Sequence, residues 1–437
     1  MSKHFDTGRT PHQEHAMDIR HTILDFASLS AALGKNRGRV QESVHAAAKK
    51  VSGDPVEQAR LLGAFNNALG KLQEEDKGAG VMSSAQNALA SRLQSYLVER
   101  ALTEHPGAAV PQAGQVKEVK FDNLDVIGWL PVGLLRIFRP AKFNRPDPTA
   151  AAEALPDQLR LAMFSDWGSG LYGAPKIRES ILGAAPAFDM VMHLGDVYYS
   201  GSEREVEERF VGMWPATGSG RHVALNGNHE MYSGGKPYFT RALPFLGQPH
   251  SCVAFQNDHW LLAGLDTAYV DHDLDSAQVA WLRRLIDNAG ARKVILFSHH
   301  QPFSQLDSQG PKLAAKLAGL LNGHRIHAWF WGHEHRCVLY AAHDAWDLKG
   351  RCVGHGGFPE FRDRFATPGT NQYEWRALPA NSDAPAAEVL DGPNLFIPGE
   401  ESRYSPHGYV TLEFDGADCR EIYLDAAGTV VRPAQTL

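Results

Sequence analysis

Five short apolar segments of this chain are each followed by residues that can bind a metal ion. The segments have the length and the β-branched or aromatic content of buried strands. Ligand-binding residues of open α/β sheets cluster just outside the carboxyl ends of strands, so five matches in order predict one site that holds two metal ions. The segments are 159–165, 189–194, 222–225, 294–298 and 327–331, followed in turn by Asp166, by Asp196 and Tyr199, by Asn228 and His229, by His299, and by His333 and His335.

The spacing of these residues defines five motifs. Each motif alone is typical of a turn, because Gly, Asp and Asn dominate turns, but their conjunction is specific. Their order resembles that of the calcineurin-like metallophosphoesterase superfamily, and within it the purple acid phosphatase branch, over residues 157–340. The motifs are Asp166-Trp167-Gly168, Gly195-Asp196-Val197-Tyr198-Tyr199, Gly227-Asn228-His229-Glu230, Ser298-His299-His300 and Gly332-His333-Glu334-His335.

Two coupled positions distinguish the branches of that superfamily. Most members have a metal-binding His in the first motif, where this chain has Gly168. The resemblance implies that Tyr199, three residues after Asp196, replaces that ligand. A phenolate is a hard anionic donor that suits Fe(III) better than Zn(II). The expected cofactors are therefore two metal ions, Fe(III) plus Fe, Zn or Mn(II).

The resemblance also implies a role for each residue of the site. Asp196 would bridge the ions and so act in catalysis, as suits a pair about 3.5–4 Å apart that generates a hydroxide nucleophile. His229 would donate a proton or hydrogen bond to the leaving oxygen. The first metal would bind Asp166, Asp196, Tyr199 and His335, and the second would bind Asp196, Asn228, His299 and His333.

Two further histidines are candidates for binding the substrate. Strand length favours His299 over His300 as the ligand, whereas alignment on the following Pro302 favours His300. With His299 as the ligand, His300 becomes a candidate contact to phosphate. His355, which stands between glycines, is the second candidate, because Ser308 occupies the position of a substrate-contacting His in some relatives.

The rest of the chain predicts an architecture. The resemblance implies an α/β fold, a four-layer α/β/β/α metallophosphoesterase sandwich. The 437 residues are divided into an all-α N-terminal domain at 1–105, a linker and docking segment at 106–156 and the catalytic domain at 157–437. Asp54-Pro55 and Ser84 are expected to begin helices. Residues 366–406 are expected to form a surface excursion, and residues 407–414 and 420–424 a hairpin.

Composition excludes some classes of partner. The net charge of −7 argues against binding to nucleic acid or to anionic membranes, which needs a basic face. The sequence has no apolar run as long as a membrane span and no signal-peptide pattern at residues 1–22. Four scattered cysteines fit a reducing compartment. We therefore expect a cytoplasmic protein, and the sequence does not indicate its oligomeric state.

The predicted function is metal-dependent hydrolysis of a small phosphoester, a phosphatase reaction in which a metal-bound hydroxide attacks phosphorus. One alternative is a phosphodiesterase that acts on a nucleotide or a phospholipid headgroup. An alternative of another class is a metal-binding regulatory or interaction module. The helical domain is then either a structural appendage or a module for oligomerisation or substrate gating.

Overall fold

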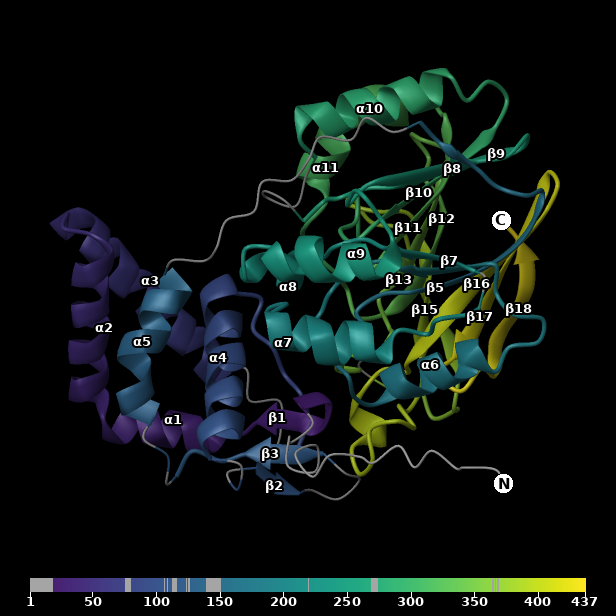
Figure 1. The fold of residues 1–437 in the computed structure, drawn as a ribbon. Coiled ribbons are helices and arrows are strands. Elements are labelled where there is room, and N and C mark those ends of the chain that lie inside the picture. Colours follow the sequence, from purple (N-terminus) through teal and green to yellow (C-terminus); the bar gives the residue numbers. More distant parts are fainter. Residues whose placement is uncertain are drawn as a thin grey trace, which may run out of the picture.

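The computed structural model describes residues 19–437 except 75–79, 106, 108, 112–115, 123, 125, 139–150, 219, 269–273, 364, 366 and 368. The part of the expected all-α domain that the structure describes begins at Ile19. Residues 1–18 and part of the expected linker lie outside the described residues. Two parts lie side by side in Figure 1, a helical unit formed by the early chain and a larger α/β part formed by the rest. We call them the N-terminal unit (described residues of 19–138) and the C-terminal part (described residues of 151–437).

The C-terminal part contains two sheets. The nine-stranded sheet has the order β14-β15-β12-β13-β11-β10-β9-β8-β4, and the six-stranded sheet has the order β18-β17-β16-β5-β6-β7. Their strands are β4 (Glu153–Ala154), β5 (Gln158–Phe164), β6 (Met190–His193), β7 (Arg221–Ala224), β8 (Val253–Gln256), β9 (Trp260–Gly264), β10 (Lys293–Ser298), β11 (Ile326–Trp331), β12 (Cys337–Ala342), β13 (Lys349–Val353), β14 (Glu374–Leu378), β15 (Ala387–Asp391), β16 (Gly408–Asp415), β17 (Asp418–Asp425) and β18 (Val430–Thr436).

Alternation along the strands explains how the sheets pack. In β5, Leu161 and Met163 belong to a core that also contains Phe297 and Phe330 of the other sheet. Successive side chains point to opposite faces of a sheet, so Ala162 lies in a separate core with helix α6. A third core joins the nine-stranded sheet to α10 and α11. The result is a mixed α/β fold with helices against both sheets.

The helices of the C-terminal part are short and lie mainly against the two sheets (Figure 1). They are α6 (Gly173–Leu182), α7 (Glu203–Glu205), α8 (Asn228–Tyr232), α9 (Leu243–Leu246), α10 (Ser276–Asp287), α11 (Pro311–Lys316) and α12 (Ala318–Leu321). None of the described helices in the chain is both long and apolar enough to cross a membrane.

The N-terminal unit is not all-α, so this expectation was wrong. Its helices are α1 (Phe26–Lys35), α2 (Arg37–Val51), α3 (Pro55–Glu74), α4 (Ala88–Glu104) and α5 (Val126–Phe138). A three-stranded sheet of order β1-β3-β2 accompanies them, formed by β1 (Thr22–Leu24), β2 (Ala109–Pro111) and β3 (Lys117–Val119). The strands have only three residues each, which is too short for a recognisable alternation in sequence.

The expected linker contributes to the core of this unit. Val119, Trp129 and Leu134 pack in one cluster with Phe65 of α3 and Leu97 of α4. The described residues of 109–138 thus belong with the N-terminal unit.

One helix start matches the prediction and another does not. Asp54 accepts a hydrogen bond from the Val56 amide at 3.0 Å and begins α3. At α4 the N-cap is Asn87, whose side chain accepts from the Ala90 amide at 3.0 Å. Ser84 precedes the helix in extended chain, because its hydroxyl lies near Gln94 and Ser91 instead.

The C-terminal region contains one confirmed prediction and one correction. β16 and β17 pair as the expected antiparallel hairpin. The expected excursion at 366–406 instead supplies β14 and β15 at the edge of the nine-stranded sheet. The Pro-, Asn- and Ser-rich composition of the connecting chain concealed these two five-residue strands.

Candidate metal centre

The predicted ligands come together where the two sheets meet. β5, β6 and β7 are parallel neighbours in one sheet, and β10 and β11 are parallel neighbours in the other. Hydrogen bonds between the loops join the strand ends, from the Asp166 amide to Gly195 O at 2.9 Å and from the Gly332 amide to His299 O at 3.0 Å. The carboxyl ends of five strands therefore open on one site.

Backbone strain is concentrated in these loops. Asp166, Asp196, His333 and His335 have positive φ angles of 56°, 77°, 69° and 52°. Such conformations cost about 1–3 kcal/mol each for residues with a side chain and persist where the surroundings over-determine them. Four of the seven non-glycine residues with positive φ in the described part of the chain are thus predicted ligands. This concentration indicates a functional site.

A tyrosine hydroxyl lies at the centre of the predicted first-metal ligands, but it belongs to Tyr198. Its oxygen is 2.9 Å from Asp166 Oδ1, 3.1 Å from Asp196 Oδ2 and 2.9 Å from His335 Nε2. Burial, together with the two carboxylates, raises the pKa of this phenol well above its usual value. A cation at this point would reverse that effect, since it favours the phenolate.

The expectation that Tyr199 is the ligand does not fit this geometry. The Tyr199 amide donates to Glu205 Oε1 at 2.7 Å, and its carbonyl faces His229 Nδ1 at 2.5 Å. Its ring is buried in the core of the N-terminal unit beneath the Arg209 guanidinium, at 5.3 Å. Glu205 thus holds the backbone of Tyr199 and Arg209 covers its ring, whereas the hydroxyl that faces the predicted ligands is that of Tyr198.

The structure explains why Gly168 occupies the position of the missing His. A Cβ atom at residue 168 would lie 2.5 Å from Asp196 O and 2.6 Å from Val197 Cα. The two loops are in contact there, since the Gly168 amide donates to Asp196 O at 3.2 Å. No side chain fits without displacement of the Asp196 loop.

The predicted second-metal ligands converge beside Asp196. His299 Nδ1 faces the Leu194 carbonyl at 3.0 Å, so Nδ1 carries the proton. Nε2 lies 3.2 Å from Asn228 Oδ1 and 3.3 Å from Asp196 Oδ2, and a metal ion bound there would take the place of its proton. A metal-binding His commonly donates its other N–H to a carbonyl in this way. This arrangement supports His299 as the ligand.

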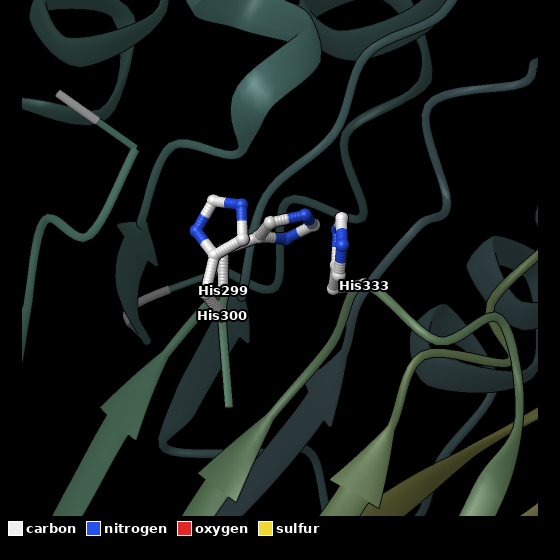
Figure 2. A group of neighbouring side chains, drawn as sticks. All are labelled: His299, His300 and His333. Atoms are coloured by element: carbon white, nitrogen blue, oxygen red, sulfur yellow. The ribbon is translucent and has the colours of Figure 1, made fainter. Parts of the chain in front are cut away.

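His300 lies close to this group as well. Figure 2 shows the rings of His299, His300 and His333 gathered beyond the strand ends. One nitrogen from each of the three lies within 4.8 Å of the others. His300 Nδ1 is 3.0 Å from Thr267 Oγ1, which holds the ring beside His333 at a centroid distance of 4.7 Å. His300 therefore remains a candidate for contact with a bound phosphate.

His229 is oriented by a backbone carbonyl. Its Nδ1 donates to Tyr199 O, and Nε2 lies 3.9 Å from Asp196 Oδ2. Its ring packs between Tyr198 and Tyr232, at centroid distances of 4.4 and 4.7 Å. Burial lowers the pKa of this imidazole, against the effect of Asp196. Nε2 faces the site and is available to interact with a substrate oxygen.

The substrate-binding role expected for His355 is not supported. Its side chain is fully buried, and the Gly408 amide donates to its carbonyl at 2.8 Å. Burial lowers its pKa to about 4. The loop around it supports Asp166, since the Gly356 amide donates to Ser165 O and the Phe358 amide to Asp166 O. A Gly-flanked His resembles a mobile contact in sequence, whereas here it is packed beneath the site.

Several residues that the sequence analysis did not single out brace the ligands. Glu230 Oε2 accepts from the amides of Asp196 at 3.1 Å and Gly227 at 2.9 Å, so it fixes two ligand loops. Glu360 Oε2 lies 3.5 Å from His335 Nδ1 and Asp307 Oδ2 lies 3.6 Å from His333 Nε2. Glu230 belongs to a recognised motif, but Glu360 and Asp307 have no sequence signal.

The electrostatics of the site favour cations. Burial opposes charge on His299 and His335, yet neighbouring carboxylates raise the pKa of each to about 9. The same imidazoles hold the pKa of Asp166 and, more strongly, that of Asp196 below the usual value despite burial. Carboxylate, phenol, amide and imidazole donors fit hard or borderline metal ions such as Fe, Zn and Mn.

A cavity of 220 Å³ lies beside two of the predicted ligands, His333 and His335. The C-terminal part lines it with residues that include Asp307, His333, His335 and Glu360, and the N-terminal unit lines it with Ser84 and Gln86. Neither His300 nor His355 is among the described residues that line the cavity. The N-terminal unit therefore forms part of the wall.

Comparisons with known proteins agree with the motif assignment. Residues 159–337 match the family model of calcineurin-like phosphoesterases. No curated protein matches the chain significantly. Solved structures that match part of the chain include a purple acid phosphatase, PPD1, from yellow lupin (Lupinus luteus), with 14% identity and a TM-score of 0.48 over 67% of this chain and 55% of the lupin chain. The match thus spans about half of that chain.

Two other solved structures are similar at a comparable level. The GAP50 protein of Plasmodium has 13% identity and a TM-score of 0.45, over 64% of this chain and 88% of its own. PhoD has 11% identity and a TM-score of 0.41, over 66% of this chain and 70% of its own. Similarity at these values does not carry functional information.

Proposed function

We propose that this chain, in which residues 159–337 form a calcineurin-like metallophosphoesterase domain, hydrolyses small phosphoesters at a dinuclear Fe(III)–M(II) centre within a four-layer α/β/β/α sandwich. The observation that carries the proposal is the position of the Tyr198 hydroxyl, within 3.1 Å of Asp166, Asp196 and His335. Fe(III) would be held by these four residues. The second ion, Fe, Zn or Mn(II), would be held by Asp196, Asn228, His299 and His333.

The protein supplies positioning and a proton donor. When bound, two such ions polarise the phosphoester and activate water as a nucleophile. His229 Nε2 faces the same space as the proposed bridging carboxylate of Asp196, so in the imidazolium form, with hydrogens on both ring nitrogens, it would donate the Nε2 proton to the leaving oxygen. The carbonyl of Tyr199 holds the Nδ1–H and thereby keeps Nε2 directed at the substrate.

The size of the cavity favours small substrates. Its 220 Å³ lies below the roughly 300–1,000 Å³ of pockets that enclose drug-sized ligands. A phosphate group with a short alcohol fits this space better than a diester with two large substituents. His300 lies beside His333 but is not among the described residues that line this cavity, so its contact with phosphate stays a prediction.

The test is a hydrolysis panel of monoesters and diesters, combined with metal analysis of the same preparation. We expect two metals per chain, at least one of them iron, and faster turnover of small monoesters than of diesters. Active protein with only zinc or manganese would refute the iron assignment but not the hydrolase. Two bound metals without hydrolysis of any ester would favour a metal-binding module instead.

A further inference from the structure

The segment Val81–Asn87 connects the N-terminal unit to the metal centre. Val81 packs against Ile397 and Tyr404 of the C-terminal part, and the Met82 amide donates to the Tyr172 hydroxyl at 2.8 Å. From the other side, Gln94 Nε2 of α4 donates to Ser83 O at 3.1 Å. Both parts of the molecule therefore hold this segment in place beside the site.

Gln86 brings an acceptor to a predicted metal ligand. Its Oε1 lies 3.2 Å from Asn228 Nδ2 and 3.5 Å from the Tyr232 hydroxyl. The same hydroxyl lies 2.8 Å from Asn228 Nδ2. The three side chains thus form a triangle, and Gln86 is its one member from the N-terminal unit.

The triangle bears on which end of the Asn228 amide faces the metal position. Only the carbonyl end of an Asn amide can bind a cation, and here Oδ1 lies 3.2 Å from His299 Nε2. The amide could rotate by half a turn unless a partner recognises its NH₂ group. A tyrosine hydroxyl can donate or accept, so Tyr232 does not discriminate. A carbonyl oxygen only accepts, so Gln86, with Oε1 facing Asn228 Nδ2, matches the orientation of Asn228 that can bind metal.

We propose that Gln86 is a positioning residue of the second metal site, through which the N-terminal unit completes the metal centre. This inference rests on the dinuclear centre proposed above. It assigns the N-terminal unit a role in the site, which an appendage would not have. Outer partners that orient a ligand typically contribute 10–100-fold to metal affinity. We expect about tenfold here, at the low end of that range, because Gln86 is an exposed residue.

The experiment is calorimetric titration of Zn(II) into the metal-free full-length protein. The wild type should show two binding events. Gln86→Leu keeps the approximate size but removes the acceptor, and should weaken one event by about tenfold while leaving the other unchanged. Gln86→Glu retains an oxygen that only accepts and should restore that affinity. Gln41→Leu, the same change at an exposed position of α2, is the matched control and should behave as the wild type.

The outcomes separate this inference from the proposed function. Two wild-type events that Gln86→Leu leaves unaltered would overturn the role of Gln86 and leave the dinuclear centre intact. Equal weakening by Gln86→Leu and Gln86→Glu would also overturn it, because the acceptor would then not matter. Fewer than two events in the wild type would overturn the dinuclear centre and this inference together. Thermal unfolding of each variant verifies that the chain remains folded.

Discussion

The two halves of the metal centre are built differently. In the first-metal half, Asp166, Asp196 and His335 all have positive φ angles. Glu360, which belongs to the C-terminal part, lies 3.5 Å from His335 Nδ1. In the second-metal half, His333 also has a positive φ angle, but Asn228 begins α8 and His299 follows β10, both with ordinary backbone. There the orientation of the Asn228 side chain is held through its Nδ2, which donates to the Tyr232 hydroxyl and to Gln86 Oε1 of the N-terminal unit.

The difference concerns where the geometry is stored. A strained loop held by its own backbone hydrogen bonds keeps its ligands in place even when a neighbouring side chain changes. A side chain amide at a helix start can rotate, so its orientation depends on its hydrogen-bond partners. We therefore expect the first half to tolerate changes in the N-terminal unit and the second half to respond to them.

The largest effect should come from the carboxylate shared by both halves. Asp196→Ala removes the proposed bridge, and with it the nucleophile and the dual charge stabilisation, so activity should fall by several orders of magnitude. Metal content measured on the same sample should fall as well. Asp258→Ala, at an exposed position, is the control. Retained metals and turnover in Asp196→Ala would show that the halves do not share this ligand.

His229 lies beside Asp196 and Tyr198 and is not a ligand in the proposed centre. His229→Ala should keep both metals and still bind inorganic phosphate, but lose about 10²–10⁴-fold in turnover, as is usual for a positioned general acid. The loss should be smaller for nitrophenyl phosphates, whose leaving group needs little protonation. Equal losses for alkyl and nitrophenyl esters would contradict the acid role and indicate phosphate positioning.

Adjacent tyrosines test the composition of the first half. Tyr198→Phe should abolish the visible tyrosinate-to-Fe(III) absorption band of the oxidised protein and weaken iron binding by more than the roughly 10–100-fold typical of residues that only orient a ligand. Tyr199→Phe is the matched control and should keep the band, because that hydroxyl faces the N-terminal unit. Loss of colour in Tyr199→Phe alone would reinstate the ligand that the motif spacing implied.

The smallest predicted effect tests the bracing of the first half. Glu360→Ala removes the acceptor for His335 Nδ1 and should weaken one metal by about tenfold. In the Zn(II) titration this should be the event that Gln86→Leu leaves unchanged. Glu388→Ala, at a partly exposed carboxylate paired with Arg432, serves as a control distant from the site. If both Glu360→Ala and Gln86→Leu weakened the same event, the two halves would not be independent.

Much of the site could be predicted from the sequence, because its signals are local. The five apolar segments became β5, β6, β7, β10 and β11, and the residues after them converge as parallel strand ends require. The types of donor were readable for the same reason. Asp166, Asp196, Asn228, His299, His333 and His335 each stand within a few residues of a strand end, where the strand itself sets their position.

Other features depended on contacts between distant segments. Which of Tyr198 and Tyr199 faces the proposed metal position could not be read from the sequence, because a loop side chain has no periodicity to set its direction, and in the structure the Tyr199 ring lies against Arg209. His355 looked like a flexible substrate contact until the packing around Asp166 buried it. Gln86 approaches Asn228 across 142 residues of chain. The sequence by itself determined the strands and the kinds of candidate ligand, whereas tertiary packing alone decided which side chains reach the proposed metal positions and which unit lies against them.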